Sequence, residues 1–134
     1  MNKVVEIRDH FDKVVATIGS LYPEGLSTTE FSRQHLFYSL FTAVAHSLYG
    51  LPGLDTARVP LGDTAAIETA RNKLDRVGEI FEIANKDVTS LGEAERQFIQ
   101  DSRRATTDET VRERRTKFLL KETLNKPGWG AGIG

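Results

Sequence analysis

Residues 30–49, EFSRQHLFYSLFTAVAHSLY, decide the fold of this chain. Read at a helical period, the stretch is apolar nearly all round, and it combines aromatic side chains with leucine, valine and alanine. A helix without a polar face has to be covered by neighbours on several sides, as in the middle of a bundle. The sequence therefore predicts a central helix over about residues 30–49. Its start is marked by possible N-caps at residues 27–29 and by a capping box between Ser27 and Glu30.

The segment before this helix has the pattern of an amphipathic helix. Apolar residues recur at steps of three and four between Val4 and Leu21, and charged residues fall between them. Pro23 and Gly25 then provide a stop signal. We expect a helix of about five turns that packs one face on the central helix.

Three further helices are predicted after a loop rich in proline and glycine at residues 50–62. The first is a long helix that starts at Asp63 or Thr64, with Gly78 inside it as a point of bending or close packing. A shorter helix follows over residues 91–104. The last begins at Thr106, within a second capping box, and runs to about Leu124.

No segment alternates as a strand would, and the chain is predicted to be all-α, a single bundle of about five helices. We expect this helical domain to span residues 1–126. Residues 127–134 are expected to form a glycine-rich tail, in which Trp129 is the side chain able to dock on the body or on a partner.

The bulk composition fits one ordinary globular domain. The chain has 134 residues, of which 39% are hydrophobic and 28% charged, enough to build a single core. It has no cysteine, which excludes disulfides, zinc–thiolate sites and a thiol nucleophile. No apolar run reaches the length of a membrane span, and the start has no signal-peptide core. A cytoplasmic protein, or a domain of one, is the expectation.

Metal and cofactor chemistry has no support in the residue pattern. The three histidines are His10, His35 and His46, and the last two are eleven positions apart on one predicted helix. At 1.5 Å per residue they lie roughly 16 Å apart along its axis, too far for one ion. We expect His46 to be a hydrogen-bonded residue of the core or its boundary, and we expect no metal and no cofactor.

Catalytic patterns are equally weak, so the chain alone is not expected to be an enzyme. Acidic residues between positions 68 and 82 alternate with lysine and arginine, which is typical of a solvated, ion-paired helix face. The sequence lacks the Gly-x-Ser-x-Gly pattern of a nucleophile elbow. The glycines of residues 128–134 do not follow a strand or open a helix, as a phosphate-binding loop requires.

Charge is segregated along a chain whose net charge is only −1. Residues 103–121 hold seven basic and three acidic side chains, a local charge of +4. Residues 62–101 hold nine acidic and five basic side chains, a local charge of −4. Such asymmetry indicates a directed surface without naming its chemistry.

Two interpretations of the basic helix are open. Arginine forks suit phosphate oxygens, which favours contact with a nucleic acid, and the candidate contact residues are Arg104, Thr106, Arg112, Arg115 and Lys117. Alternatively, the arginines pair with the acidic segment and are structural. The sequence pI near 6.3 weakens the case for nucleic acid, because binding modules for it are usually basic.

The same helix carries a family resemblance. Thr106-Thr107, followed by Arg112 and Arg115 and then by Phe118-Leu119, resembles the C-terminal helical portion of GmrSD-type ParB-like nuclease proteins. These are bacterial modification-dependent restriction and defence proteins. The resemblance covers about residues 30–121 and implies a helical module attached to a nuclease domain or working beside one.

The catalytic half of that family has no counterpart in this chain. Its Asp-Gly-Gln-Arg type motif is missing, since no Asp-Gly dipeptide occurs in the sequence. The leading hypothesis is therefore a non-catalytic helical module of a bacterial defence or DNA-processing system, with DNA or a ParB-like nuclease as its partner. The alternative is a protein-interaction or oligomerisation bundle without nucleic-acid contact.

Overall fold

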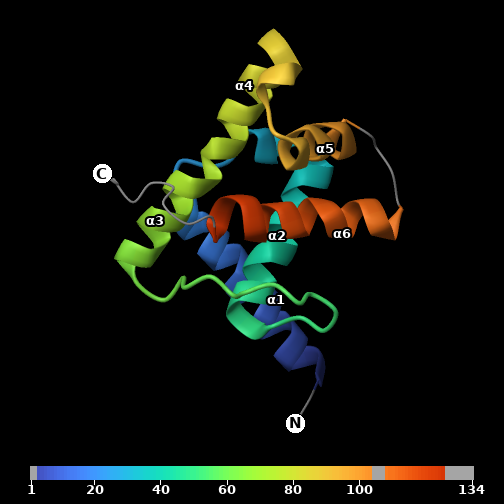
Figure 1. Ribbon diagram of the computed structural model, residues 1–134. Coiled ribbons are helices and arrows are strands. Elements are labelled where there is room, and N and C mark those ends of the chain that lie inside the picture. Colours follow the sequence, from blue (N-terminus) through green and yellow to red (C-terminus); the bar gives the residue numbers. More distant parts are fainter. Residues whose placement is uncertain (1–2, 104–107, 126–134) are drawn as a thin grey trace.

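The computed structural model describes residues 3–103 and 108–125, and the regular secondary structure in these ranges is all helical (Figure 1). This confirms the prediction of an all-α bundle. Six α-helices are present in the described part of the chain, where about five were expected. They are α1 (Lys3–Leu21), α2 (Gln34–Tyr49), α3 (Thr64–Leu74), α4 (Arg76–Asp87), α5 (Glu93–Ser102) and α6 (Glu109–Phe118).

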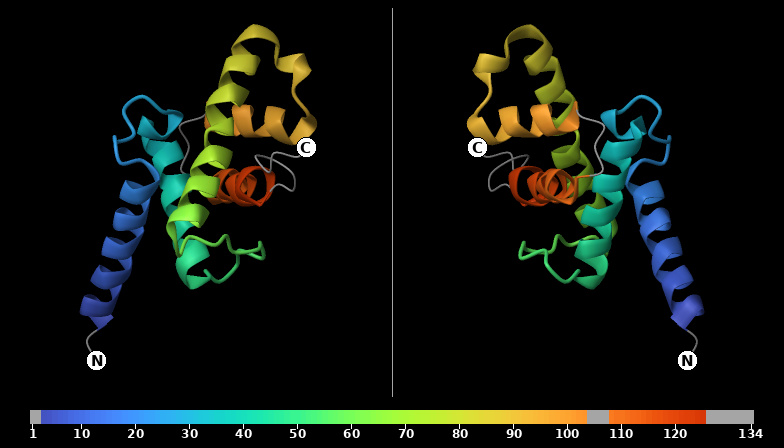
Figure 2. Two further views of the ribbon diagram at one scale, coloured as in Figure 1. Left: turned by 90° about the vertical axis from the view of Figure 1, so that its left-hand side faces the viewer. Right: turned by 90° about the vertical axis from the view of Figure 1, so that its right-hand side faces the viewer.

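The central helix of the bundle is α2, as predicted. It packs between α1 on one side and α6 on the other, and Figure 2 shows α1 along the outer flank of the molecule. Leu36, Leu40 and Ala43 are fully buried along the inward stripe of α2. The apolar side chains between positions 30 and 49 are not all buried, however. Tyr38 and Tyr49 are exposed.

The start of α2 differs from the prediction of one helix over residues 30–49. A single 3₁₀ turn, η1 (Glu30–Ser32), comes first, and the hydroxyl of Thr29 caps it by accepting a hydrogen bond from the Phe31 amide at 3.1 Å. Arg33 is extended and separates this turn from α2. The Thr29 cap confirms one of the predicted start signals.

The long helix expected from residue 63 is divided into α3 and α4 at Asp75. Its start is as predicted, since the Asp63 carboxylate accepts a hydrogen bond from the Ala66 amide at 2.8 Å. The role expected for Gly78 is wrong, because the break comes three residues earlier. An added Cβ at Gly78 would meet no atom within 4 Å, so close packing does not require this glycine either.

The loop between α2 and α3 is tied to the end of α2. His46 is buried there, and its Nε2 donates to the Thr56 carbonyl at 2.7 Å while its Nδ1 accepts from the Leu51 amide at 2.9 Å. Arg58 donates to the carbonyls of the last turn of α2, at 2.7 Å for Leu48. The prediction that His46 is a hydrogen-bonded core residue is confirmed.

The last two helices pack on each other through aromatic rings. Phe98 of α5 and Phe118 of α6 are stacked with their centroids 4.2 Å apart. α6 begins at Glu109, later than predicted, and its N-cap is Asp108, which accepts from the Thr110 amide at 2.8 Å. The helical path continues to Leu124, as expected, but its last part is a π-helix, η3 (Leu119–Leu124).

In the described part of the chain, none of the helices combines the length and the apolar character needed to cross a membrane. The boundary of the predicted tail, including Trp129, lies outside the described residues.

Candidate functional site: the basic helix and its cleft

The helix α6 presents its basic side chains in several directions, and Arg115 points inward. Its side chain belongs to the largest fully buried ones of the protein, with 1% of the residue exposed. It donates a hydrogen bond from Nη1 to the Asp101 carbonyl at 2.9 Å and one from Nε to the Ser39 hydroxyl at 3.4 Å. The expectation that Arg115 contacts a nucleic acid or partner is therefore wrong, since its guanidinium is enclosed by α2 and α5.

The neighbouring Arg114 is also held by the fold. Its guanidinium makes a two-pronged hydrogen bond to the Asp101 carboxylate, with distances of 2.9 Å from Nε and 2.7 Å from Nη2. Only 2% of the Asp101 side chain is exposed, against 43% of the Arg114 side chain. This is the paired arrangement of arginine and carboxylate that gives the strongest charge-assisted hydrogen bonds.

Asp101 thus lies at the centre of the contact between α5 and α6. Burial alone would raise the pKa of its carboxyl, but the hydrogen bonds from Arg114 and Gln97 outweigh burial and lower the pKa from its usual value. Desolvation in turn lowers the pKa of Arg115, and the negative charge of Asp101 opposes this. His35 of α2 completes the cluster by contacting the Ser102 carbonyl through Nε2.

Of the remaining predicted contact residues, Lys117 is on the surface of α6. Its ammonium group forms an ion pair with Glu113 of the same helix at 3.1 Å. Arg104 and Thr106 lie outside the described residues. Of the three predicted residues that the structure describes, Arg115 points inward whereas Arg112 and Lys117 do not, so these three do not form one face.

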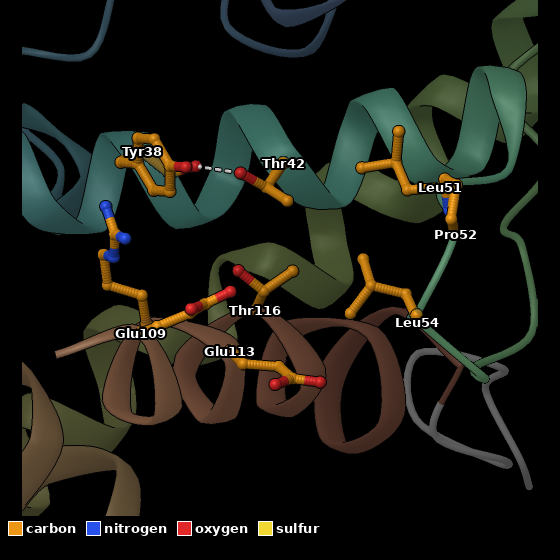
Figure 3. Close-up of a pocket in the computed structure, with 10 residues that line it drawn as sticks. Tyr38, Thr42, Leu51, Pro52, Leu54, Glu109, Glu113 and Thr116 are labelled. Atoms are coloured by element: carbon orange, nitrogen blue, oxygen red, sulfur yellow. Dashed lines mark hydrogen bonds between the residues drawn. The ribbon is translucent and has the colours of Figure 1, made fainter.

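Arg112 occupies a different environment, an open cleft between α2, α6 and the loop after α2. The cleft has a volume of about 410 Å³. Figure 3 shows Tyr38 and Glu109 at one end and the apolar residues of the loop at the other, with Thr42, Thr116 and Glu113 between them. Its lining consists of Tyr38, Thr42, Leu51, Pro52, Gly53, Leu54, Glu109, Arg112, Glu113 and Thr116.

The Arg112 side chain is half-buried in this cleft and is loosely held by it. Its guanidinium carbon lies 5.4 Å from the centroid of the Tyr38 ring, within the range of a cation–π contact. Its Nε is inaccessible to solvent and has no hydrogen-bond partner among the described residues. Arg112 thus differs from Arg114 and Arg115, whose guanidinium groups are fixed by acceptors in the fold.

Sequence reasoning missed the other side of the cleft. Tyr38 belongs to the stretch predicted to be covered nearly all round, but it is two positions from Leu36 and Leu40 and so lies off the buried stripe. A helical wheel drawn through residues 36, 40 and 43 would have placed it on the surface. The contribution of Leu51 and Leu54 depends on the path of a loop and has no signal in the sequence.

In the described part of the chain, no group of three or more histidine, aspartate or glutamate side chains is arranged to hold a metal ion.

Comparison with known proteins gives no further guide. No protein-family model, no curated protein and no solved structure matches the chain.

Proposed function

We propose that this chain is a non-catalytic helical module of a bacterial defence or DNA-processing system, and that it contacts a partner protein and not a nucleic acid. The assignment to such a system rests on the resemblance of Thr106-Thr107, Arg112, Arg115 and Phe118-Leu119 to a defence family. The choice of a protein partner rests on the geometry of the basic helix.

The observation that carries the choice is the burial of Arg115 together with the pairing of Arg114. Binding to a nucleic acid needs several cations free to neutralise phosphates. Here two of the three arginines of α6 are bound within the fold, Arg114 to the Asp101 carboxylate and Arg115 to the Asp101 carbonyl at the end of α5. Arg112 remains in a cleft and is the one arginine of its lining, whereas a nucleic-acid backbone needs several free cations.

Exposed apolar side chains on α1 support a protein partner independently. Phe11 is 55% exposed and Val15 is 45% exposed, one turn apart on the outer flank of the molecule. The Phe11 ring lies against Phe41 of α2, at 5.3 Å between centroids, and so extends an aromatic surface shared by two helices. Exposed apolar surface of this kind is typical of contact sites between proteins.

The test uses the double variant Phe11→Ser/Val15→Ser. Both side chains are exposed, so the variant should stay folded by circular dichroism. We expect the wild-type chain either to self-associate in light scattering or to bind the co-expressed product of a gene adjacent to its own, and the variant to lose that association. Val88→Ser, another exposed apolar position on the 3₁₀ turn η2 (Val88–Ser90), is the matched control and should keep it.

Binding of the chain to DNA, the opposing outcome, is measured by fluorescence anisotropy with a labelled DNA duplex. We expect no binding at low salt. Binding whose affinity falls with a log–log slope near −3 in salt, as about three or four neutralised phosphates give, would contradict the proposal. Absence of both self-association and a bound neighbour would contradict it as well.

A further inference from the structure

We propose that the cleft between α2 and α6 receives a short segment of the partner protein, with a carboxylate on Arg112 and an apolar side chain against Leu51 and Leu54. This inference rests on the proposed function, because it assumes that the partner is a protein. It adds the chemistry that the partner has to present.

The acceptor for a carboxylate is Arg112. Among the described residues, Arg71 and Arg33 also lie over aromatic rings, at 4.2 Å for Arg71 on Tyr22 and 4.5 Å for Arg33 on Phe81. Each of those two pairs with a carboxylate of the chain, at 2.7 Å for Arg71 and 2.9 Å for Arg33. Arg112 has the ring contact but, among the described residues, no ion pair with a carboxylate; its Nε lacks an acceptor, as does the Nε of Arg33.

An arginine stacked on a ring but not fixed by an acceptor suits an incoming ligand. The Tyr38 ring limits the positions of the guanidinium, which reduces the entropy lost on binding. Because Nε is covered in the free protein, a fork-to-fork contact along the Nε edge requires the guanidinium to turn toward the ligand. A carboxylate can accept two parallel hydrogen bonds from such a fork.

The opposite end of the cleft is apolar and preformed. Leu51, Pro52 and Leu54 line it on the loop after α2 (Figure 3). The loop is anchored at this point, since the Leu51 amide donates to the buried His46 ring. A loop fixed in this way offers a wall for an apolar side chain without a large ordering cost on binding.

The charge of the lining favours a single carboxylate over a phosphate group. The cleft contains one arginine and two glutamates, Glu109 and Glu113. Glu113 is paired with Lys117 at 3.1 Å, and Glu109 is the other carboxylate of the lining. A doubly charged phosphate meets more repulsion in this setting than a carboxylate with one charge. The volume of about 410 Å³ is in the range of known ligand pockets.

The test is a nuclear magnetic resonance titration of the ¹⁵N-labelled chain with blocked peptides. Because the direction of the partner segment is open, the probes are acetyl-Leu-Gly-Asp-amide and acetyl-Asp-Gly-Leu-amide, each beside its analogue with asparagine in place of aspartate. We expect shifts at the amides of Leu51, Leu54, Arg112 and Thr116. One acidic peptide should bind about tenfold more tightly than its asparagine analogue, the effect of a hydrogen bond between charged groups.

Two variants make the outcome specific. Arg112→Gln should remove the preference for aspartate over asparagine while the weak apolar contact persists. Arg96→Gln, an exposed position on α5 away from the cleft, is the control and should bind as the wild type does. Equal binding of the acidic and neutral peptides, no binding in either order up to millimolar peptide, or shifts outside the cleft would overturn the inference.

Inorganic phosphate serves as a third probe and separates the possible failures. Phosphate that binds the cleft as tightly as the acidic peptide would overturn the inference in favour of a phosphate ligand. Peptide failure with intact partner association by the wild type would reject only this cleft chemistry. DNA binding in the anisotropy experiment would reject the proposed function itself.

Discussion

Arg115 carries a positive charge into a position where only 1% of the residue is exposed. An arginine stays protonated even there, so the fold has to supply acceptors and a counter-charge. The Asp101 carbonyl, the Ser39 hydroxyl and the Asp101 carboxylate paired with Arg114 provide them. A complete buried cluster of this kind changes the stability of the fold little. Removal of one member destabilises the fold strongly, because it leaves a buried charge without its partner.

Replacing Arg115 should therefore destabilise the protein strongly. We expect Arg115→Met to lower the free energy of unfolding by about 3 kcal/mol, because the Asp101 carbonyl loses its donor and the buried charge cluster loses a cation. Arg112→Met should cost less than about 1 kcal/mol, since it loses only a partly exposed cation–π contact. Urea denaturation measures both values, and equal losses would contradict the different environments of the two arginines.

Asp101 should make stability depend on pH in the acid range. Its pKa is lower in the folded protein than the usual 3.8, so the folded state favours the carboxylate. That contribution is fully present above the unfolded pKa and is lost as the pH falls through the folded pKa. We expect the stability difference between wild type and Asp101→Asn to shrink as the pH falls below about 4 in denaturant titrations. A constant difference over this range would contradict the assignment.

At the scale of the helix, α2 shows how an apolar stretch is divided between core and surface. Its fully buried residues repeat at positions 36, 40 and 43, whereas Tyr38 is 49% exposed and lines the cleft. Phe41 is half-buried and contacts the rings of Phe37 and Phe11. The bundle covers the helix on the sides of α1 and α6, and η1 and η3 also pack on it, while the edge that carries Tyr38 stays exposed.

This orientation predicts unequal effects of truncation along α2. Leu40→Ala should cost about 3 kcal/mol, as large-to-small changes at fully buried leucines do. Tyr38→Ala should cost less than about 1 kcal/mol, because about half of the surface of Tyr38 is already in contact with solvent. Thermal and urea unfolding of the two variants check the orientation, and a larger loss for Tyr38→Ala would place that face of α2 in the core.

At the scale of the whole molecule, the segregated charges meet at one point. Asp101 ends the acidic segment and Arg114 lies in the basic one, and the two form an ion pair at 2.7 Å. The alternative that the arginines pair with the acidic helices is confirmed for Arg114. The opposite charges of the two segments therefore help to hold α6 on α5. They do not by themselves indicate a surface for a partner.

The arrangement of the helices also predicts a gradient of local stability. α1 lies on the outer flank with exposed apolar side chains, whereas α2 is covered from both sides (Figure 2). Amides of α2 should exchange with solvent at rates near those of global unfolding, and amides of α1 should exchange faster by local opening. Hydrogen exchange with mass spectrometry measures this, and equal protection of α1 and α2 in the isolated chain would contradict it.

The sequence by itself determined the helical class, the central place of residues 34–49 and the structural role of His46. These follow from local rules, because periodicity, caps and the absence of strand alternation act within a few residues of each other. It did not determine which arginine is buried. Arg112 and Arg115 are three positions apart on one helix, and a rotation of the helix by about 60° would bring Arg112 to the direction in which Arg115 points.

Tertiary packing decided that rotation. Phe118 stacks on Phe98 of α5, and this contact turns α6 so that Arg115 enters the bundle. The cleft is also a product of tertiary structure, since it joins Tyr38, the loop after α2 and Arg112 from segments far apart in the chain. No spacing in the sequence encodes such a meeting, because it depends on how three elements cross and not on the period of any one of them.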